Sequence, residues 1–329
     1  MDQATQLREL AQRRGGGSAA APPDPIPAAR PRSPLPGATA ATHLAAPEPP
    51  PRRLARAIAV TSGKGGVGKS NLSVGLAIGF ARRGLKTCLL DADLGMANAD
   101  VLCGLSPEHT LESVVRGARR LSEVVMPAPG GFFLIPGASG VGRIANLQVA
   151  EQRRLVEQLR LLERTVDMVV IDTGAGVGSG VMTFAAAAGI TLVAVTPEPT
   201  SMTDAYGAIK VLASEVPDTR IRLVVNMATS PAEAREVHDR IDRVSRRFLG
   251  KGVEFAGAIP LDPNLPQAVR KQQPLAVLNP QSPAAAAVDG IAAKLASEID
   301  AGERAAAANE PLEGAGFLQR LAGWIRRGH

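Results

Sequence analysis

A glycine-rich octapeptide constrains the fold of this chain more than any other feature of its sequence. It spans Gly63 to Ser70, reads GKGGVGKS, and directly follows the apolar run Ala57 to Thr61. A helical pattern of apolar residues then runs from Lys69 to Arg83. Strand, glycine loop and helix in this order predict a phosphate-binding loop, because backbone amides curl around phosphate oxygens and the helix directs its positive end at them.

The loop fits two kinds of nucleotide site. Its glycines have the spacing of a dinucleotide fingerprint, and acidic residues follow at about the distance of a ribose-binding acid. Lys69 and Ser70 favour a triphosphate, which needs a cation at its β and γ phosphates and a hydroxyl for magnesium. A dehydrogenase is the remote alternative. The residues expected to surround the nucleotide phosphates are Gly63, Lys64, Gly65, Gly66, Val67, Gly68, Lys69, Ser70 and Asn71.

Acidic residues follow two further apolar runs. Asp172 ends the run Met168 to Ile171, where a carboxylate can hold the hydration shell of the magnesium ion that Ser70 binds. Asp91 and Asp93 close another strand and can face the same crevice. We expect Asp93 to orient a water molecule and Asp91 to assist the metal, although Asp91 also fits a turn cap.

The choice of base follows from an absent motif. Guanine-specific P-loop proteins carry an Asn-Lys-x-Asp segment, whereas Asn226 is followed by Met, Ala and Thr. No carboxylate is there to pair with guanine. Asn226 can still hydrogen-bond adenine, with the segment Pro260-Leu261-Asp262 walling the other side, although Asn226 also fits a strand terminus. ATP is therefore the expected nucleotide.

Apolar runs and helical patterns alternate through the body of the chain. This alternation predicts an α/β fold with a doubly wound, mostly parallel sheet joined by crossover helices. The predicted strands are 57–61, 87–90, 132–135, 168–171, 191–196, 221–226 and 254–259, and the predicted helices are 69–83, 148–164, 203–213, 231–248 and 283–299.

The two ends of the chain differ from this body. Residues 1–14 have the spacing of a short amphipathic helix, and 15–56 form an Ala- and Pro-rich tether. We expect an ATPase domain at 57–300 and a linker with an amphipathic helix at 301–329. The apolar side chains of that helix fall within an arc of about 120°, and they are Phe317, Leu318, Leu321, Trp324 and Ile325. Packing on its own domain is the alternative to membrane binding.

Composition limits the compartment. Cys88 and Cys103 are the only cysteines, so neither a disulfide framework nor a zinc site is expected. The N-terminus lacks a secretory pattern, and the most apolar window, 181–195, reads as a helix followed by a strand. We expect a cytoplasmic protein. The net charge of +6 favours acidic partners without choosing between nucleic acid and anionic lipid.

These residues resemble the MinD/ParA family of deviant P-loop ATPases, of the SIMIBI class, over 57–297. The resemblance rests on Lys64, the second lysine of the loop. It implies that Lys64 reaches the nucleotide of a partner subunit, so that ATP joins a homodimer and hydrolysis separates it. It further implies that Lys69 holds the phosphates, Asp93 positions the attacking water and Asp172 supports the metal.

Three segments resemble the flagellar-number regulators of this family, the FlhG or FleN group. They are 91–98 (DADLGMAN), 196–205 (TPEPTSMTDA) and the N-terminal residues Asp2, Gln3, Ala4, Leu7 and Arg8. The N-terminal segment resembles the one that stimulates the signal-recognition-type GTPase FlhF. The resemblance also implies reversible attachment to the inner face of the cytoplasmic membrane, including at a cell pole, and a FleQ-type transcriptional activator or flagellar switch proteins as partners.

Other functions stay open at this point. A ParA-type partition ATPase would bind DNA nonspecifically, and a septum-placing MinD would explain a membrane helix but not the N-terminal segment. Specific nucleic-acid recognition is not expected. An iron-sulfur scaffold of the related Mrp type would need a paired-cysteine motif, which the sequence lacks.

Overall fold

The computed structural model describes residues 54–93, 98–137, 148–217 and 219–308, together with Arg320, Leu321 and Gly323. Its centre is an eight-stranded sheet in the order β3-β4-β2-β5-β1-β6-β7-β8. All neighbouring strands are parallel except β3 and β4. The strands are β1 (Arg56–Ser62), β2 (Thr87–Ala92), β3 (Met126–Pro127), β4 (Phe133–Ile135), β5 (Met168–Ala175), β6 (Ile190–Val195), β7 (Arg220–Ala228) and β8 (Glu254–Pro260).

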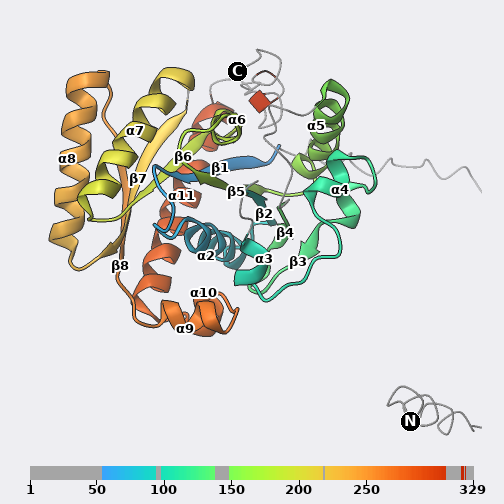
Figure 1. Cartoon of the computed structure of the whole chain (residues 1–329), viewed down its shortest axis with the longest axis horizontal. Helices are drawn as coiled ribbons and strands as arrows, with labels where there is room; N and C mark the ends of the chain where they lie inside the picture. The colour runs from blue at the N-terminus through green and yellow to red at the C-terminus, as the bar shows by residue number, and fades with distance from the viewer. Residues whose placement is uncertain are drawn as a thin grey trace, which may run out of the picture. The chain divides into compact units, whose positions relative to one another are not determined.

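Helices cover both faces of this sheet. One layer contains α2 (Lys69–Arg82), α3 (Ala99–Leu102), α9 (Leu265–Arg270), α10 (Leu275–Leu278) and α11 (Pro283–Ala308). The other contains α4 (Leu111–Val115), α5 (Val149–Glu163), α6 (Ser179–Ala187), α7 (Pro199–Glu215) and α8 (Pro231–Leu249) (Figure 1). Successive residues of the central strands alternate between the cores of the two layers, which is the doubly wound arrangement that the alternating pattern predicted.

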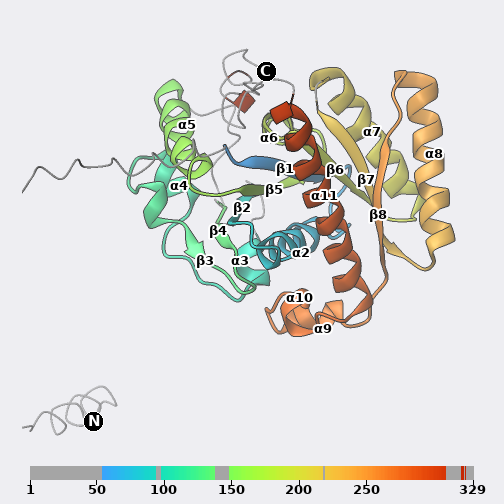
Figure 2. The same ribbon diagram turned by 180° about the vertical axis from the view of Figure 1, so that it is seen from behind.

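Two helices pack unusually closely beneath the phosphate loop. A Cβ atom on Gly75 of α2 would lie 2.8 Å from the Val288 side chain of α11, and one on Gly79 would lie 2.6 Å from that of Ala292. Figure 2 shows α11 crossing this layer beside α2. Small residues let the two helices approach, so α2 is held firmly at the place where it begins the nucleotide site.

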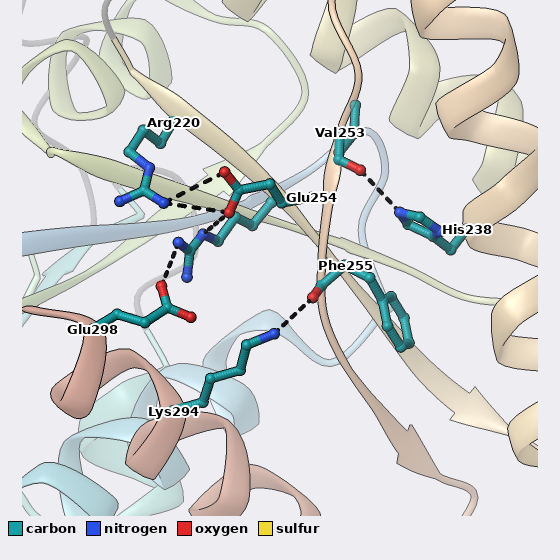
Figure 3. Close-up of polar contacts among 8 residues, drawn as sticks. Arg220, His238, Val253, Glu254, Phe255, Lys294 and Glu298 are labelled. Carbon is teal, nitrogen blue, oxygen red and sulfur yellow. Dashed lines mark hydrogen bonds and ion pairs between the residues drawn. The ribbon is translucent and has the colours of Figure 1, made fainter.

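The edge strand β8 is tied to both layers. Lys294 of α11 donates to the carbonyl of Phe255, and a ring nitrogen of His238 on α8 lies 2.8 Å from the carbonyl of Val253 (Figure 3). Arg222 of β7, only 2% exposed, pairs with Glu254 at 2.8 Å and with Glu298 of α11 at 2.5 Å. The single buried charge of this arginine therefore has two carboxylate partners.

The predicted strands are confirmed, each within a few residues of its expected bounds. The sequence pattern did not predict β3, the one antiparallel strand in the described part, or the short helices α3, α4, α9 and α10. The predicted N-terminal segment at 1–14, with Asp2, Gln3, Ala4, Leu7 and Arg8, lies outside the described residues, as does the tether up to residue 53.

The C-terminal segment is described at only three positions. Leu321 is 1% exposed and packs in the core formed by α5, α6 and the start of β1. Arg320 Nε donates to the carbonyl of Ala187, the last residue of α6, at 3.0 Å. In this conformation Leu321 packs on its own domain, which is the alternative to membrane binding given above, and it cannot contact lipid. Phe317, Leu318, Trp324 and Ile325 lie outside the described residues.

A membrane-spanning helix is not found. Among the described residues no helix combines the length and the apolar character that crossing a bilayer requires.

Candidate nucleotide site

The glycine loop lies where β1, the central strand, gives way to α2. Gly66 and Gly68 have φ values of 80° and 86°, a left-handed conformation that side chains disfavour. Gly68 is the N-cap of α2, so the first amides of this helix point into the loop. Lys69 begins the helix and is 8% exposed, and its predicted contact with the phosphates stays a prediction.

Asn226 fixes the loop from the end of β7. Its Nδ2 donates to the carbonyl of Val67 at 2.8 Å, and its Oδ1 accepts from the N–H of Met227. A Cβ atom on Gly68 would lie 2.4 Å from Nδ2, so only glycine leaves room for this contact. The adenine contact predicted for Asn226 can use its second N–H or the second lone pair of Oδ1, and it stays a prediction.

The loop after β8 differs from the prediction. Asp262 is 4% exposed, and its carboxylate accepts from the backbone N–H and the side-chain amide of Asn264 and from the N–H of Ala284 near the start of α11. Burial raises the pKa of Asp262, but these hydrogen bonds outweigh it and lower the pKa below its ordinary value. Asp262 therefore anchors the loop, and its carboxylate is engaged within the protein instead of lining a pocket for the base.

Leu261, the middle residue of the predicted segment, stays open to a ligand, since it is 63% exposed. An exposed leucine at the carboxyl end of a sheet offers an apolar face to a purine. Asn71, Asn226 and Leu265 are among the residues that line a mostly apolar cavity of about 40 Å³. The base contact expected near Leu261 stays a prediction.

Two carboxylates are buried side by side at the ends of neighbouring strands. Asp91 of β2 and Asp172 of β5 are register partners and are 0% and 1% exposed. Burial, and then the charge of Asp172, raises the pKa of Asp91 to about 7; burial likewise raises that of Asp172 to about 6. Such paired, desolvated acids are typical of functional sites.

Asp91 has a structural role. One carboxylate oxygen accepts from the N–H of Asp93, and the other accepts from the N–H groups of Asn98 and Ala99, all at 3.1 Å. These bonds close the loop that carries Asp93 and cap α3. Both oxygens of Asp91 thus serve the turn cap that the sequence also allowed, and its predicted metal role stays a prediction.

Asp172 fits a magnesium site. Its Oδ1 accepts from the hydroxyl of Ser73 at 3.0 Å, the nearby Ser70 hydroxyl lowers the pKa of the carboxyl, and the buried Oδ2 has no partner among the described atoms. No group of three or more acidic, cysteine or histidine side chains forms a metal cage in the described part of the chain. Magnesium held by nucleotide phosphates, water and one or two side chains needs no such cage.

Asp93 lies beside the glycine turn that follows Asp172. A Cβ atom on Gly174 would lie 3.4 Å from Asp93 Oδ1. The two acids expected to act on the γ-phosphate are therefore brought to the same edge by β2 and β5.

Lys64 turns toward α7. Its Nζ lies 2.5 Å from Glu198 Oε2 and 3.2 Å from Thr200 Oγ1 at the start of that helix. Its neighbour Gly63 packs on the same helix, since a Cβ atom there would lie 2.0 Å from the carbonyl carbon of Asp204. The first two residues of the phosphate loop thus contact α7 directly.

Comparison with known proteins shows the family to which the chain belongs. The ParA family model, described as the NUBPL iron-transfer P-loop NTPase, matches residues 53–296. The chain belongs to the MinD/ParA family of P-loop ATPases. It is 42% identical over 240 residues to the antiactivator FleN of Pseudomonas aeruginosa, covering 73% of this chain and 86% of FleN. These matches also confirm its resemblance to the FlhG branch.

Two further relatives agree. The flagellum site-determining protein YlxH of Helicobacter pylori is 33% identical over 271 residues, which is 82% of this chain and 90% of YlxH. The solved structure of the cell division protein MinD of Aquifex aeolicus is 26% identical and superimposes with a TM-score of 0.60, over 74% of this chain and 97% of that one. The chain is therefore an ATPase with the MinD fold.

Proposed function

We propose that this ATPase is a switch that regulates the number and placement of flagella, with ATP joining two copies of the chain and hydrolysis separating them. The observation that carries the proposal is the position of Lys64. It belongs to the phosphate loop, yet its ammonium group rests on α7 with 30% of its side chain exposed. A mobile cation at the surface beside the nucleotide can leave Glu198 for the phosphates of a second copy.

The contact between the loop and α7 supports a switch. Gly63 touches the backbone of Asp204 with no side chain between them, so a shift of the loop on ATP binding must move α7. Lys64 leaves its partners on the same helix when it crosses to the other copy. Loop and helix therefore change together.

The chemistry on the γ-phosphate divides among four side chains. Lys69 neutralises the phosphates, and Ser70 and Asp172 would hold a magnesium ion, which supplies charge stabilisation at the transferred phosphoryl group. Asp93 orients the attacking water. Asp91 and Gly174 set the position of Asp93 from two sides.

Membrane association would use the C-terminal helix. Because Leu321 is buried against α6, the helix must leave this slot before it can lie on lipid. A single short amphipathic helix binds weakly, whereas two in a dimer add their free energies. Dimerisation by ATP would therefore favour the inner face of the cytoplasmic membrane.

The named relatives suggest partners. FleN is called an antiactivator, which points to a transcriptional activator, and YlxH determines the flagellar site. The N-terminal residues Asp2 to Arg8 would stimulate an FlhF-type GTPase. That segment lies outside the described residues, so its test is a peptide of residues 1–14 added to the GTPase, with Gln3→Ala as the weakened variant.

The dimer is tested by light scattering after gel filtration. With ATP and magnesium, the hydrolysis-blocked Asp93→Ala chain should run as a dimer, and Asp93→Ala with Lys64→Ala as a monomer. Lys210→Ala, an exposed lysine on the same α7, is the matched control and should leave the dimer intact. A dimer that survives loss of Lys64 would contradict the proposal.

Partition of DNA and placement of the septum are the competing functions. Pelleting with liposomes of anionic lipid in ATP, lost on truncation before residue 309, supports the flagellar or septal switch. Salt-sensitive DNA retention without liposome binding would favour partition instead. Stimulation of the GTPase separates the flagellar from the septal role.

A further inference from the structure

Two serines on α2 face the same carboxylate. Ser70 and Ser73 are three residues apart, which places their side chains on one side of the helix. The Ser73 hydroxyl donates to Asp172 Oδ1 at 3.0 Å, and the Ser70 hydroxyl lies close enough to lower the pKa of the same carboxyl. Ser73 and Asp172 are 0% and 1% exposed.

The two hydroxyls cannot keep the same role when ATP and magnesium arrive. The serine that follows the loop lysine is the one whose oxygen binds the metal in P-loop sites. Ser70 would therefore turn from Asp172 to the ion. Ser73, one turn deeper and fully buried, has no access to the ion and stays on the carboxylate.

We propose that Ser73 is the positioning residue of the magnesium site, holding the Asp172 carboxylate so that its unpartnered Oδ2 faces the metal hydration shell. Oδ2 is buried with no hydrogen-bond partner among the described atoms, which leaves it free for a water on the ion. Without the Ser73 bond, the carboxylate could rotate, and nothing else in the described surroundings would fix Oδ1 once Ser70 has turned. Partners of this kind matter because they orient the group that meets the metal.

The inference rests on the proposed metal role of Asp172, and the experiment separates the two. A fluorescent ADP analogue is titrated into the full chain at a series of magnesium concentrations and again in EDTA. Ser73→Ala should raise the magnesium concentration needed for half-maximal tightening about 10-fold, with affinity in EDTA unchanged. Ser73→Thr, which keeps the hydroxyl, should restore the magnesium response.

Controls keep the result interpretable. Ser245→Ala removes another fully buried hydroxyl, on α8 and without a partner, and should leave the magnesium response unchanged. Ser73→Cys has nearly the original shape and a weak donor, so it should show a several-fold loss even if the alanine variant fails to fold.

Two outcomes overturn the inference in different ways. If Asp172→Asn abolishes the magnesium response while Ser73→Ala and Ser73→Cys leave it intact, Ser73 does not position the carboxylate. If Asp172→Asn itself leaves the response intact, the metal role of Asp172 fails as well.

Discussion

Lys64 and Glu198 lie 134 residues apart in the sequence, and their side chains meet at 2.5 Å between the phosphate loop and α7. Thr200 adds a second bond to the same ammonium group. In a single copy of the chain, Glu198 binds the ammonium group of Lys64 that is expected to bind the nucleotide of a second copy. Dimerisation therefore competes with this internal ion pair.

The first prediction weakens that pair. Glu198→Gln should tighten the ATP-dependent dimer of the Asp93→Ala chain, because each protomer no longer gives up an ion pair. An exposed pair is worth about 0.2 to 1 kcal/mol, so breaking two per dimer should improve the dimer dissociation constant between about 2-fold and 30-fold. Sedimentation velocity over a concentration series measures this constant. A weaker dimer would mean that Glu198 stabilises the dimer interface by more than its ion pair with Lys64 stabilises the monomer.

The second prediction concerns the contact of Gly63 with α7. Gly63→Ala should push the loop and α7 apart, because the added methyl would lie 2.0 Å from a backbone carbon. We expect a loss of about 1 to 3 kcal/mol in the free energy of unfolding together with weaker ATP binding. Gly207→Ala, on α7 itself, is the matched control, since a Cβ there meets nothing within 4 Å. Urea unfolding and nucleotide titration of both variants decide the question, and equal behaviour would refute the coupling.

The third prediction follows from the protonation of Asp172. Its pKa is raised from 3.8 to about 6, so the folded chain holds this proton more tightly than the unfolded chain. Its stabilising contribution is full below about pH 4 and is lost as the pH rises through 6. Asp172→Asn should therefore raise the melting temperature of the nucleotide-free protein at pH 8, and much less at pH 5. Differential scanning fluorimetry across this range measures it. An equal gain at both pH values would show that the buried charge is not the cause.

The fourth prediction tests the docking of the C-terminal segment. Leu321→Ala should lower the free energy of unfolding by about 2 kcal/mol, because it empties a slot in the core under α6. Leu161→Ala, on neighbouring α5 and 61% exposed, should change it by less than about 0.5 kcal/mol. Chemical denaturation of the nucleotide-free chain compares them. Equal effects would show that the slot adds no stability.

The sequence predicted those parts of the site that one segment determines alone. The glycine loop, with its left-handed Gly66 and Gly68, follows from local backbone requirements, and Asp172 follows from an apolar run that ends in an acid. The parallel sheet with crossover helices also follows from the alternating pattern, whereas the order of the strands was not predicted.

The sequence could not predict side chains whose role depends on a distant partner. Asp91 and Asp93 have the same local pattern, and only the backbone amides of Asn98 and Ala99 turn Asp91 into a cap. The sequence pattern could not reveal the hydrogen bond between Asp262 and the N–H of Ala284, because the two residues are 22 positions apart. Asp262 was therefore assigned to the base pocket. Ser73 gave no signal, since a serine within a helix is commonplace. Ser70 and Ser73, three positions apart on α2, are a hint only once Asp172 is known to lie opposite.

The ties on β8 restrict how this protein can assemble. Carbonyls of Val253 and Phe255 already accept hydrogen bonds from His238 and Lys294, which belong to helices in different layers. A strand from another chain would have to break these bonds before it could extend the sheet. These bonds therefore disfavour open-ended filaments that grow through this edge of the sheet. They favour closed, reversible assemblies that use other surfaces of the chain.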